Sequence, residues 1–176
     1  MNDEKGQLSG EYMLLVGSLI VVLMISIFMI ANENELNIAM AAAKSGADEG
    51  VASSSSAIYP KETFNEYDDM EGLKHPYSVS IVNVSYNSSG IDENYGKQKI
   101  QFKVYAKASA DYNKKELDSI GDRINYNLRK SVATSFNTTD STNKLYNPVF
   151  SNNYVFTTAN VCLLYTSPSP RDGLLS

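Results

Sequence analysis

The strongest constraint on this chain is an apolar stretch near its beginning, from Tyr12 to Ala31. A helix over these 20 residues would rise roughly 30 Å, the thickness of the hydrocarbon core of a bilayer. Its polar members are Ser18 and Ser26, whose hydroxyls can bond back to helix carbonyls, and Gly17 permits close helix approach. Taken alone, the stretch is typical of a single-span membrane anchor.

A short polar leader precedes the stretch and reads Lys5-Gly6-Gln7-Leu8-Ser9-Gly10-Glu11-Tyr12. A secretory signal peptide is cut after its apolar region, but the small-residue site here, Gly6, lies before it, so the apolar helix would stay in the product. KGQLSGEY resembles the class III signal peptide of archaeal type IV pilins, especially those of methanogens. The resemblance implies that a prepilin peptidase cuts after Gly6 and that the mature chain begins at Gln7.

Glu11 stands at the mouth of the apolar helix. A carboxylate costs on the order of 2.5–3.5 kcal/mol at the centre of a bilayer, and less near the interface, so its presence favours a role in binding a partner. The resemblance implies that the partner is the freed amine of Gln7 on an adjacent subunit. If Gln7 cyclises, a hydrogen bond from its ring or from backbone would replace the ion pair. A simpler interpretation, in which Glu11 only marks the membrane interface, also remains open.

Beyond a polar step at Asn32–Glu35, the composition again favours a helix to about residue 52. Leu36, Met40, Ala43 and Ala47 form one apolar stripe, on which we expect the rest of the protein to pack. Gly46 and Gly50 weaken the prediction in the last turns, and Ser53–Ser56 reads as a frayed end or linker. A flexible hinge is the alternative for this Ala/Ser-rich part.

The remainder predicts a small head with strands followed by a helix. Tyr77–Tyr86 and Lys99–Ala108 alternate as strands, and the turn residues between them predict antiparallel neighbours joined by a loop of about ten residues. Lys114–Phe136 predicts an amphipathic helix that covers the sheet, and the apolar residues within 145–161 predict a further strand. Archaeal pilins usually carry an all-β head, so the helix departs from the family pattern and leaves open whether this is a major or a minor pilin.

Composition argues against several function classes. The chain has 20 acidic and 15 basic residues, a net charge of −5, which argues against nucleic acid as a partner. The lone His75 has no second histidine or cysteine with which to build a catalytic or zinc site, so we expect no catalytic residues. The acidic run at Glu66–Glu71 lacks the spacing of a calcium loop and predicts a solvated loop instead. We therefore expect neither a metal nor a cofactor.

Three sequons for N-glycosylation lie in the predicted head, beginning at Asn83, Asn87 and Asn137. Asn87 falls in the predicted turn and is the best acceptor on that basis. Asn83 lies within a predicted strand and is the weakest.

The last segment, Cys162–Ser176, begins with CLLYTSPSPRD, which resembles the translation of a transposon-end adapter used in sequencing libraries. We interpret it as a fusion scar and expect it to contribute nothing to fold or function. On this interpretation the only cysteine does not belong to the protein, and the true end of the chain beyond Val161 is not defined by the sequence.

The sequence thus predicts an α+β protein with four parts: a leader at 1–6, a long N-terminal helix at 7–56, an extracellular head at 57–161 and the scar at 162–176. By resemblance it is a pilin that rests in the membrane and is then assembled by the pilus machinery into a homo-oligomeric surface filament for adhesion. A single-span tether that carries an extracellular binding domain is the main alternative, and an anchored enzyme is a weaker one.

Overall fold

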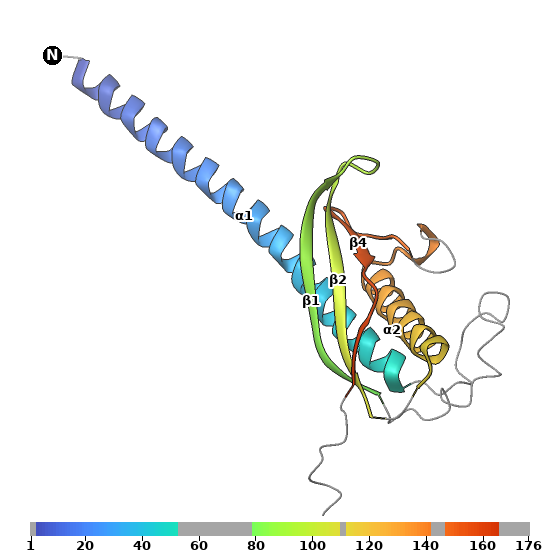
Figure 1. Ribbon diagram of the computed structural model, residues 1–176. Helices are drawn as coiled ribbons and strands as arrows, with labels where there is room; N and C mark the ends of the chain where they lie inside the picture. Colours follow the sequence, from blue (N-terminus) through green and yellow to red (C-terminus); the bar gives the residue numbers. More distant parts are fainter. Residues whose placement is uncertain (1–2, 53–78, 110–111, 142–146, 166–176) are drawn as a thin grey trace, which may run out of the picture. The chain divides into compact units, whose positions relative to one another are not determined.

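A computed structural model describes residues 3–52, 79–109, 112–141 and 147–165, with side chains from Ser9 onward, and has the predicted α+β arrangement (Figure 1). Its first element is the long helix α1, Asp3–Ala52. The chain divides into two compact units, Met1–Asn37 and Ile38–Ser176, which are described separately. The structure describes α1 as far as Ala52, and the remaining residues of the predicted segment 7–56, Ser53–Ser56, lie outside the described residues.

In the second unit, the last turns of α1 pack against helix α2, Lys114–Ser135, through small residues. Ala39, Ala43 and Ala47 are fully buried. A Cβ atom built on Gly46 would lie 2.5 Å from the backbone oxygen of Asn127, and one on Gly50 would lie 2.8 Å from the Cα of Ile124. The two glycines, which weaken a helix prediction, are therefore the residues that let the two backbones approach each other.

Helix α2 begins with a capping box. The side chain of Asn113 accepts a hydrogen bond from the backbone N–H of Glu116, and the Glu116 carboxylate accepts one from the N–H of Asn113, both at 2.9 Å. The spacing of Leu117, Ile120, Ile124, Leu128 and Val132 predicts one apolar face, and all of these residues are buried except Leu117, which is half-buried. The polar side chains of Arg123, Asn125 and Asn127 are buried as well. The helix is thus covered on more than its amphipathic face, since it packs both on α1 and on strands of the sheet.

Strands β1, Val79–Asp92, and β2, Lys97–Ala108, form the predicted antiparallel pair. The predicted ten-residue loop is wrong, because the pairing continues through Asn87 and Ser88 to Asp92 and leaves only the turn Glu93–Gly96. Asn87 is therefore a strand residue and not a turn residue. Backbone pairing does not depend on apolar side chains, so a polar sequence that reads as a loop extends the hairpin here.

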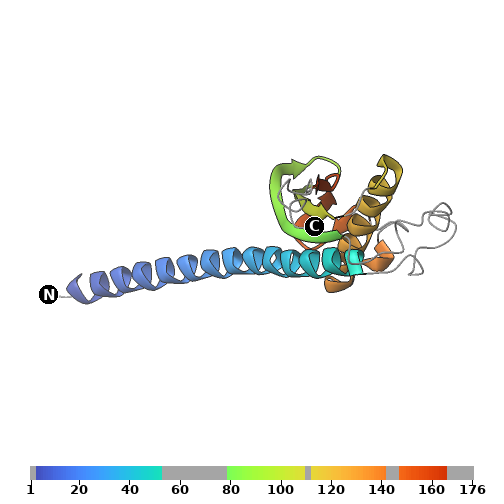
Figure 2. The same ribbon diagram turned by 60° about the horizontal axis from the view of Figure 1, so that its bottom comes forward.

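The sheet is mixed and not purely antiparallel as predicted. Strand β4, Tyr154–Thr158, runs parallel to β2 and is joined in an antiparallel hairpin to the short β3, Val149–Phe150. A parallel neighbour requires a crossover connection, which α2 supplies between β2 and β4. Figures 1 and 2 show α2 beside β4, which it contacts. The single strand predicted within 145–161 is thus two strands.

A fifth strand, β5, Cys162–Tyr165, also runs parallel to β2, next along the same edge after β4. It comprises the first residues of the segment that we interpret as a scar and expected to lie outside the fold. Backbone hydrogen bonds can add a strand of almost any sequence to a sheet edge. The origin of Cys162–Ser176 stays a prediction.

The core of the second unit lies between α2 and the sheet. Its largest fully buried side chains come from β2, α2 and the β3–β4 hairpin: Phe102, Phe156, Ile100, Ile120, Ile124, Leu128, Val104, Val132, Val149 and Val155. Phe156 stacks on both Phe102 and Phe136, with ring centroids 5.6 and 5.7 Å apart. This aromatic stack packs the middle of the sheet against the C-terminal end of α2.

Candidate functional site

The apolar part of α1 meets the length and composition criteria for a membrane-spanning helix, with a mean hydropathy of 2.9 over its most apolar window. None of that window is buried. Ser18 and Ser26 donate hydrogen bonds to the carbonyl oxygens of Leu15 and Val22, both at 2.8 Å, so their hydroxyls are satisfied within the helix. This bonding removes the main polar obstacle to an apolar environment, as the sequence predicts.

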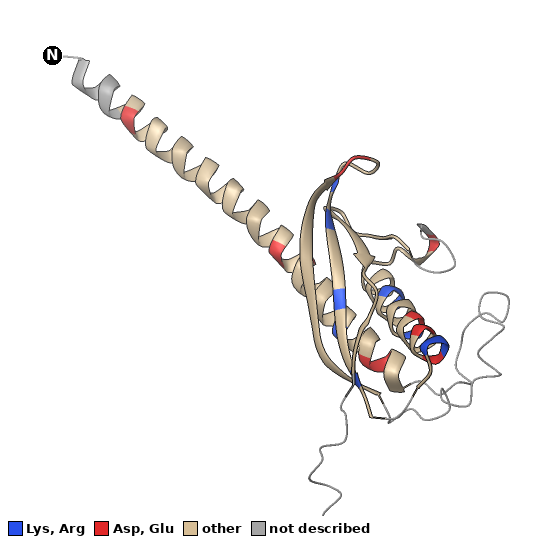
Figure 3. Ribbon diagram, viewed as in Figure 1, with Lys and Arg blue, Asp and Glu red and all other residues tan. Residues whose placement is uncertain are grey.

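Glu11 is exposed near the start of this helix. Figure 3 shows an uncharged helix between Glu11 and the acidic residues that follow Asn32. Among the side chains that the structure describes, no cation forms an ion pair with Glu11. Gly6 and Gln7 have helical backbone, but their side chains lie outside the described set. The structure therefore places the predicted processing and assembly residues on one continuous helix.

Two of the three sequons lie on the outer face of the hairpin. Asn83 pairs with Tyr105 and Asn87 with Gln101 across β1 and β2. These two partners alternate along β2 with the buried residues Ile100, Phe102 and Val104, so Asn83 and Asn87 face away from the core. Both asparagines are exposed.

The third sequon begins at the C-terminal end of α2. Asn137 has a left-handed backbone with φ of 54°. Its N–H donates to the carbonyl of Thr134, and the N–H of Thr138 donates to that of Ala133, which together form a Schellman motif. Because the motif holds the backbone in a tight bend, the exposed Asn137 side chain projects from a helix end and not from a sheet.

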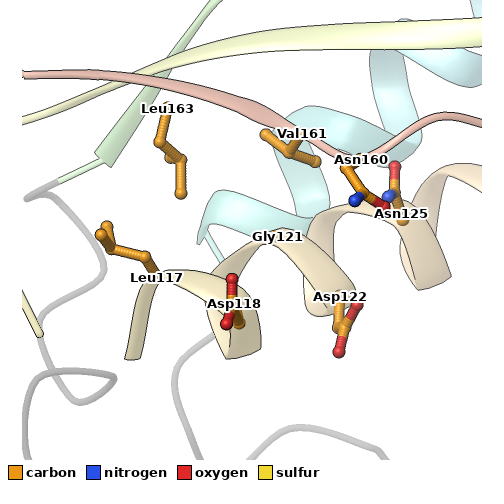
Figure 4. A pocket seen from close by; sticks show the side chains of 8 residues that line it. All are labelled: Leu117, Asp118, Gly121, Asp122, Asn125, Asn160, Val161 and Leu163. Carbon is orange, nitrogen blue, oxygen red and sulfur yellow. The ribbon is translucent and has the colours of Figure 1, made fainter. Parts of the chain in front are cut away.

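A pocket of about 340 Å³ lies between α2 and the segment after β4. Figure 4 shows its lining, which consists of Leu117, Asp118, Gly121, Asp122, Asn125, Asn160, Val161 and Leu163. The Nδ2 group of Asn125 donates a 3.0 Å hydrogen bond to the carbonyl of Ala159 and so ties the two walls together. Four of the lining side chains carry oxygen atoms, which gives the pocket an acidic and amide-rich character.

Two charged residues of α2, Asp122 and Arg129, have shifted pKa values. Partial burial raises the pKa of Asp122, Arg129 lowers it, and the like charge of Asp118 raises it further. Burial in turn lowers the pKa of Arg129, whose Nη1 donates to Thr158 Oγ1 at 2.6 Å. The sequence contains only a weak signal for this pocket, which is that Asp118, Asp122 and Asn125 recur at helical spacing on α2.

The predictions about metal ligands and about His75 concern residues elsewhere in the chain. Within the described ranges, no group of three or more His, Cys, Asp or Glu side chains could hold a metal ion. His75 and the acidic run at Glu66–Glu71 lie outside those ranges.

Comparison with known proteins adds no relative. No family model matches the chain, and no curated protein or solved structure matches it significantly.

Proposed function

We propose that this protein is a structural subunit of an archaeal type IV pilus-like surface filament, assembled through α1 after its leader is cleaved at Gly6. The observation that carries the proposal is the exposed apolar helix directly behind the KGQLSGEY sequence. The proposal assigns the protein no reaction and no cofactor. Its partners are further copies of the chain, the prepilin peptidase, the pilus assembly machinery and, before assembly, the membrane.

The exposed apolar surface of α1 is expected to be buried against lipid or other protein chains. Large apolar side chains are more than half exposed along its whole first span: Tyr12, Met13, Leu14, Leu15, Leu19, Ile20, Val21, Val22, Leu23, Met24, Ile25, Ile27, Phe28, Met29 and Ile30. Covering each one is worth about 1.5–3 kcal/mol. They include consecutive residues and so surround the helix, which fits lipid or a bundle of many helices better than one flat partner surface.

In a single-span membrane tether, lipid would bury the same apolar surface. The residues before the span therefore distinguish a filament subunit from a tether. A tether has no use for a small-residue cut at Gly6 or for a carboxylate at Glu11. A filament subunit uses both, since the cut frees an amine at Gln7 that can pair with Glu11 of a neighbouring copy. The head would then lie on the outside of the filament, where it would contribute to surface attachment.

The proposal is tested by the mature N-terminus and by the filaments themselves. We expect mass spectrometry of the protein from its native cells to find a chain that begins at Gln7, either free or cyclised, and electron microscopy to show filaments that contain it. A Gly6→Leu variant should keep its leader, insert in the membrane and form no filaments.

An intact leader on the native protein would contradict the pilin assignment. A chain that begins at Gln7 but occurs only as single copies in the membrane would instead support the tether. An anti-head antibody that labels cell membranes but no filaments would give the same answer.

A further inference from the structure

We propose that the outer face of strand β2 binds an acidic polysaccharide, a chain of sugars that carry carboxylate groups, through a row of lysines (Figure 3). The lysine row consists of Lys97, Lys99, Lys103 and Lys107. Binding by the row does not depend on the filament function, whereas its use in surface attachment rests on that proposed function.

The alternation of β2 places all four lysines on one face of the sheet. The even-numbered residues from 100 to 108 are buried in the core: Ile100, Phe102, Val104, Ala106 and Ala108. The odd-numbered residues therefore face away from the core. At roughly 3.4 Å per residue, the row extends over about 34 Å, which is long enough to contact several sugars of an extended polymer.

Lys103 and Lys107 carry positive charge that no carboxylate compensates within the described part of the chain. Both side chains are exposed. The Nζ atom of Lys103 lies 5.1 Å from the centroid of the Tyr105 ring, which is on the same face of the strand. This part of the row is thus available to an anionic ligand.

The other two lysines are held in place by the protein. The Nζ atom of Lys99 lies 3.7 Å from the carboxylate of Asp92, and the Nζ atom of Lys97 donates a 2.6 Å hydrogen bond to the carbonyl of Ser151. Both side chains are half-buried. The free positive charge of the row is therefore concentrated at Lys103 and Lys107.

Neutral hydrogen-bonding groups flank the row on both sides. In β1, Ser85 lies opposite Lys103. Gln101 lies between Asn87 of β1 and Thr157 of β4. Hydroxyl and amide groups beside ammonium groups suit a ligand that carries both hydroxyls and carboxylates.

The acidic residues lie on other elements. Figure 3 shows red residues on α1, on α2 and at the tip of the β1–β2 hairpin, while blue residues follow β2 along its length. From Ile38 onward, the exposed acidic side chains include Asp48, Glu49, Glu93, Asp118, Asp122 and Asp140, the last in the 3-10 helix η4, Thr139–Ser141. A chain with a net charge of −5 thus keeps one face positive, and such a face is complementary to a polyanion.

The chemistry of this face favours a polysaccharide over a nucleic acid. Proteins that bind single-stranded nucleic acid stack its bases on aromatic rings. Tyr105 lies on this face, but its ring already contacts the ammonium group of Lys103. An acidic sugar needs no stacking surface, because its carboxylate can accept charge-assisted hydrogen bonds from lysine while its hydroxyls bond to neighbouring amides.

The test uses the full chain in non-ionic detergent micelles, produced in cells that attach no N-glycans, because sugars on Asn83 or Asn87 would lie beside the row. Oligomers of polygalacturonate are titrated into the protein and binding is measured by calorimetry. Dextran oligomers of equal length are the neutral control. We expect saturable binding of polygalacturonate that weakens as the salt concentration rises, and no binding of dextran.

Paired variants locate the binding face. Lys103→Gln and Lys107→Gln together remove two exposed charges and should weaken binding by about tenfold or more, with an unchanged Tm. The matched control combines Lys114→Gln and Lys115→Gln, which remove the same charge from exposed side chains in the first turn of α2. This control should bind polygalacturonate as the wild type does.

Three outcomes would overturn the proposal. Polygalacturonate could fail to bind, or the two double variants could lose affinity equally, which would place the attraction elsewhere than on the lysine row. Equally tight binding of poly-L-glutamate or single-stranded DNA of the same charge would show that the row attracts any polyanion and does not select a polysaccharide. All of these measurements are independent of cleavage at Gly6 and of filament formation, so their failure would leave the proposed function intact.

Discussion

The predicted assembly contact depends on a single side chain, Glu11. It is the only charged residue between Ser9 and Ala31, and it is exposed on α1. In a bundle of apolar helices an unpaired carboxylate is costly, and removal of one partner from a buried pair leaves the other charge uncompensated. The pairing with the Gln7 amine of another copy would therefore set the axial register between subunits.

The first prediction follows from this pairing. Glu11→Ala should leave cleavage at Gly6 and membrane insertion unchanged but reduce filament yield at least tenfold, as counted by electron microscopy. Glu33→Ala is the matched control, because it removes an exposed carboxylate from the other side of the apolar span of the same helix. Normal filament numbers in the Glu11→Ala strain would show that Glu11 is not an assembly contact.

The three sequons lead to a second prediction at this scale. All three asparagines are exposed, but Asn137 extends from a helix end, whereas Asn83 and Asn87 lie on a strand. On this geometry we expect Asn137, and not Asn87, to be the best acceptor of an N-linked glycan. We expect mass spectrometry of native protein to find a glycan on Asn137 most often, and Asn137→Gln to remove one glycan mass. Unmodified peptides at all three sites would refute N-glycosylation of the head.

At the scale of elements, the contact between α1 and α2 depends on the absence of side chains. Gly46 and Gly50 stand four residues apart on α1, and each lies against the backbone of α2. Small residues at this spacing allow two helix backbones to come close together. Gly50 lies against Ile124 and Gly46 against Leu128, and both of these α2 residues are completely buried.

The third prediction tests this contact. Gly46→Val would place a branched side chain where even a Cβ lies 2.7 Å from that of Ser131, so overpacking should destabilise the head by about 1–3 kcal/mol or more. Ser45→Val puts the same residue at the exposed neighbouring position and should change stability by less than about 0.5 kcal/mol. Thermal unfolding of both variants measures the difference. Equal melting temperatures would mean that α1 does not pack closely on α2 in solution.

At the scale of the whole molecule, the two units differ in how much apolar surface they expose to solvent. The second unit, from Ile38 onward, contains the buried core, while the first carries the exposed apolar side chains. A protein with this division is expected to be insoluble because of its first unit alone.

The fourth prediction separates the two units. A fragment that begins at Ile38 should be soluble and monomeric without detergent, and should unfold cooperatively, because it retains the α1 residues that cover α2. A fragment that begins at Val51 lacks Ala39–Gly50, so it should expose Ile124 and Leu128 and aggregate. Size-exclusion chromatography and circular dichroism distinguish them. Aggregation of the longer fragment would contradict the assignment of an independent core.

Several elements could be predicted from local sequence alone. The length of the apolar run, the face of α2 and the alternation of β2 each depend on neighbouring residues, so periodicity is enough to place them. The same is true of the sequons and of the leader motif, which are contiguous. These features carry the functional proposal, and they do not need a tertiary structure.

Other features depend on residues that are distant in sequence, and only the tertiary structure decided them. The parallel pairing of β4 with β2 follows from the crossover through α2, and the role of Gly46 follows from the position of Asn127. The pocket of Asp118, Asp122, Asn125 and Asn160 exists because the chain returns across α2 after β4. Local pattern contains no information on such approaches, because they are set by how whole elements pack and not by the propensities of single residues.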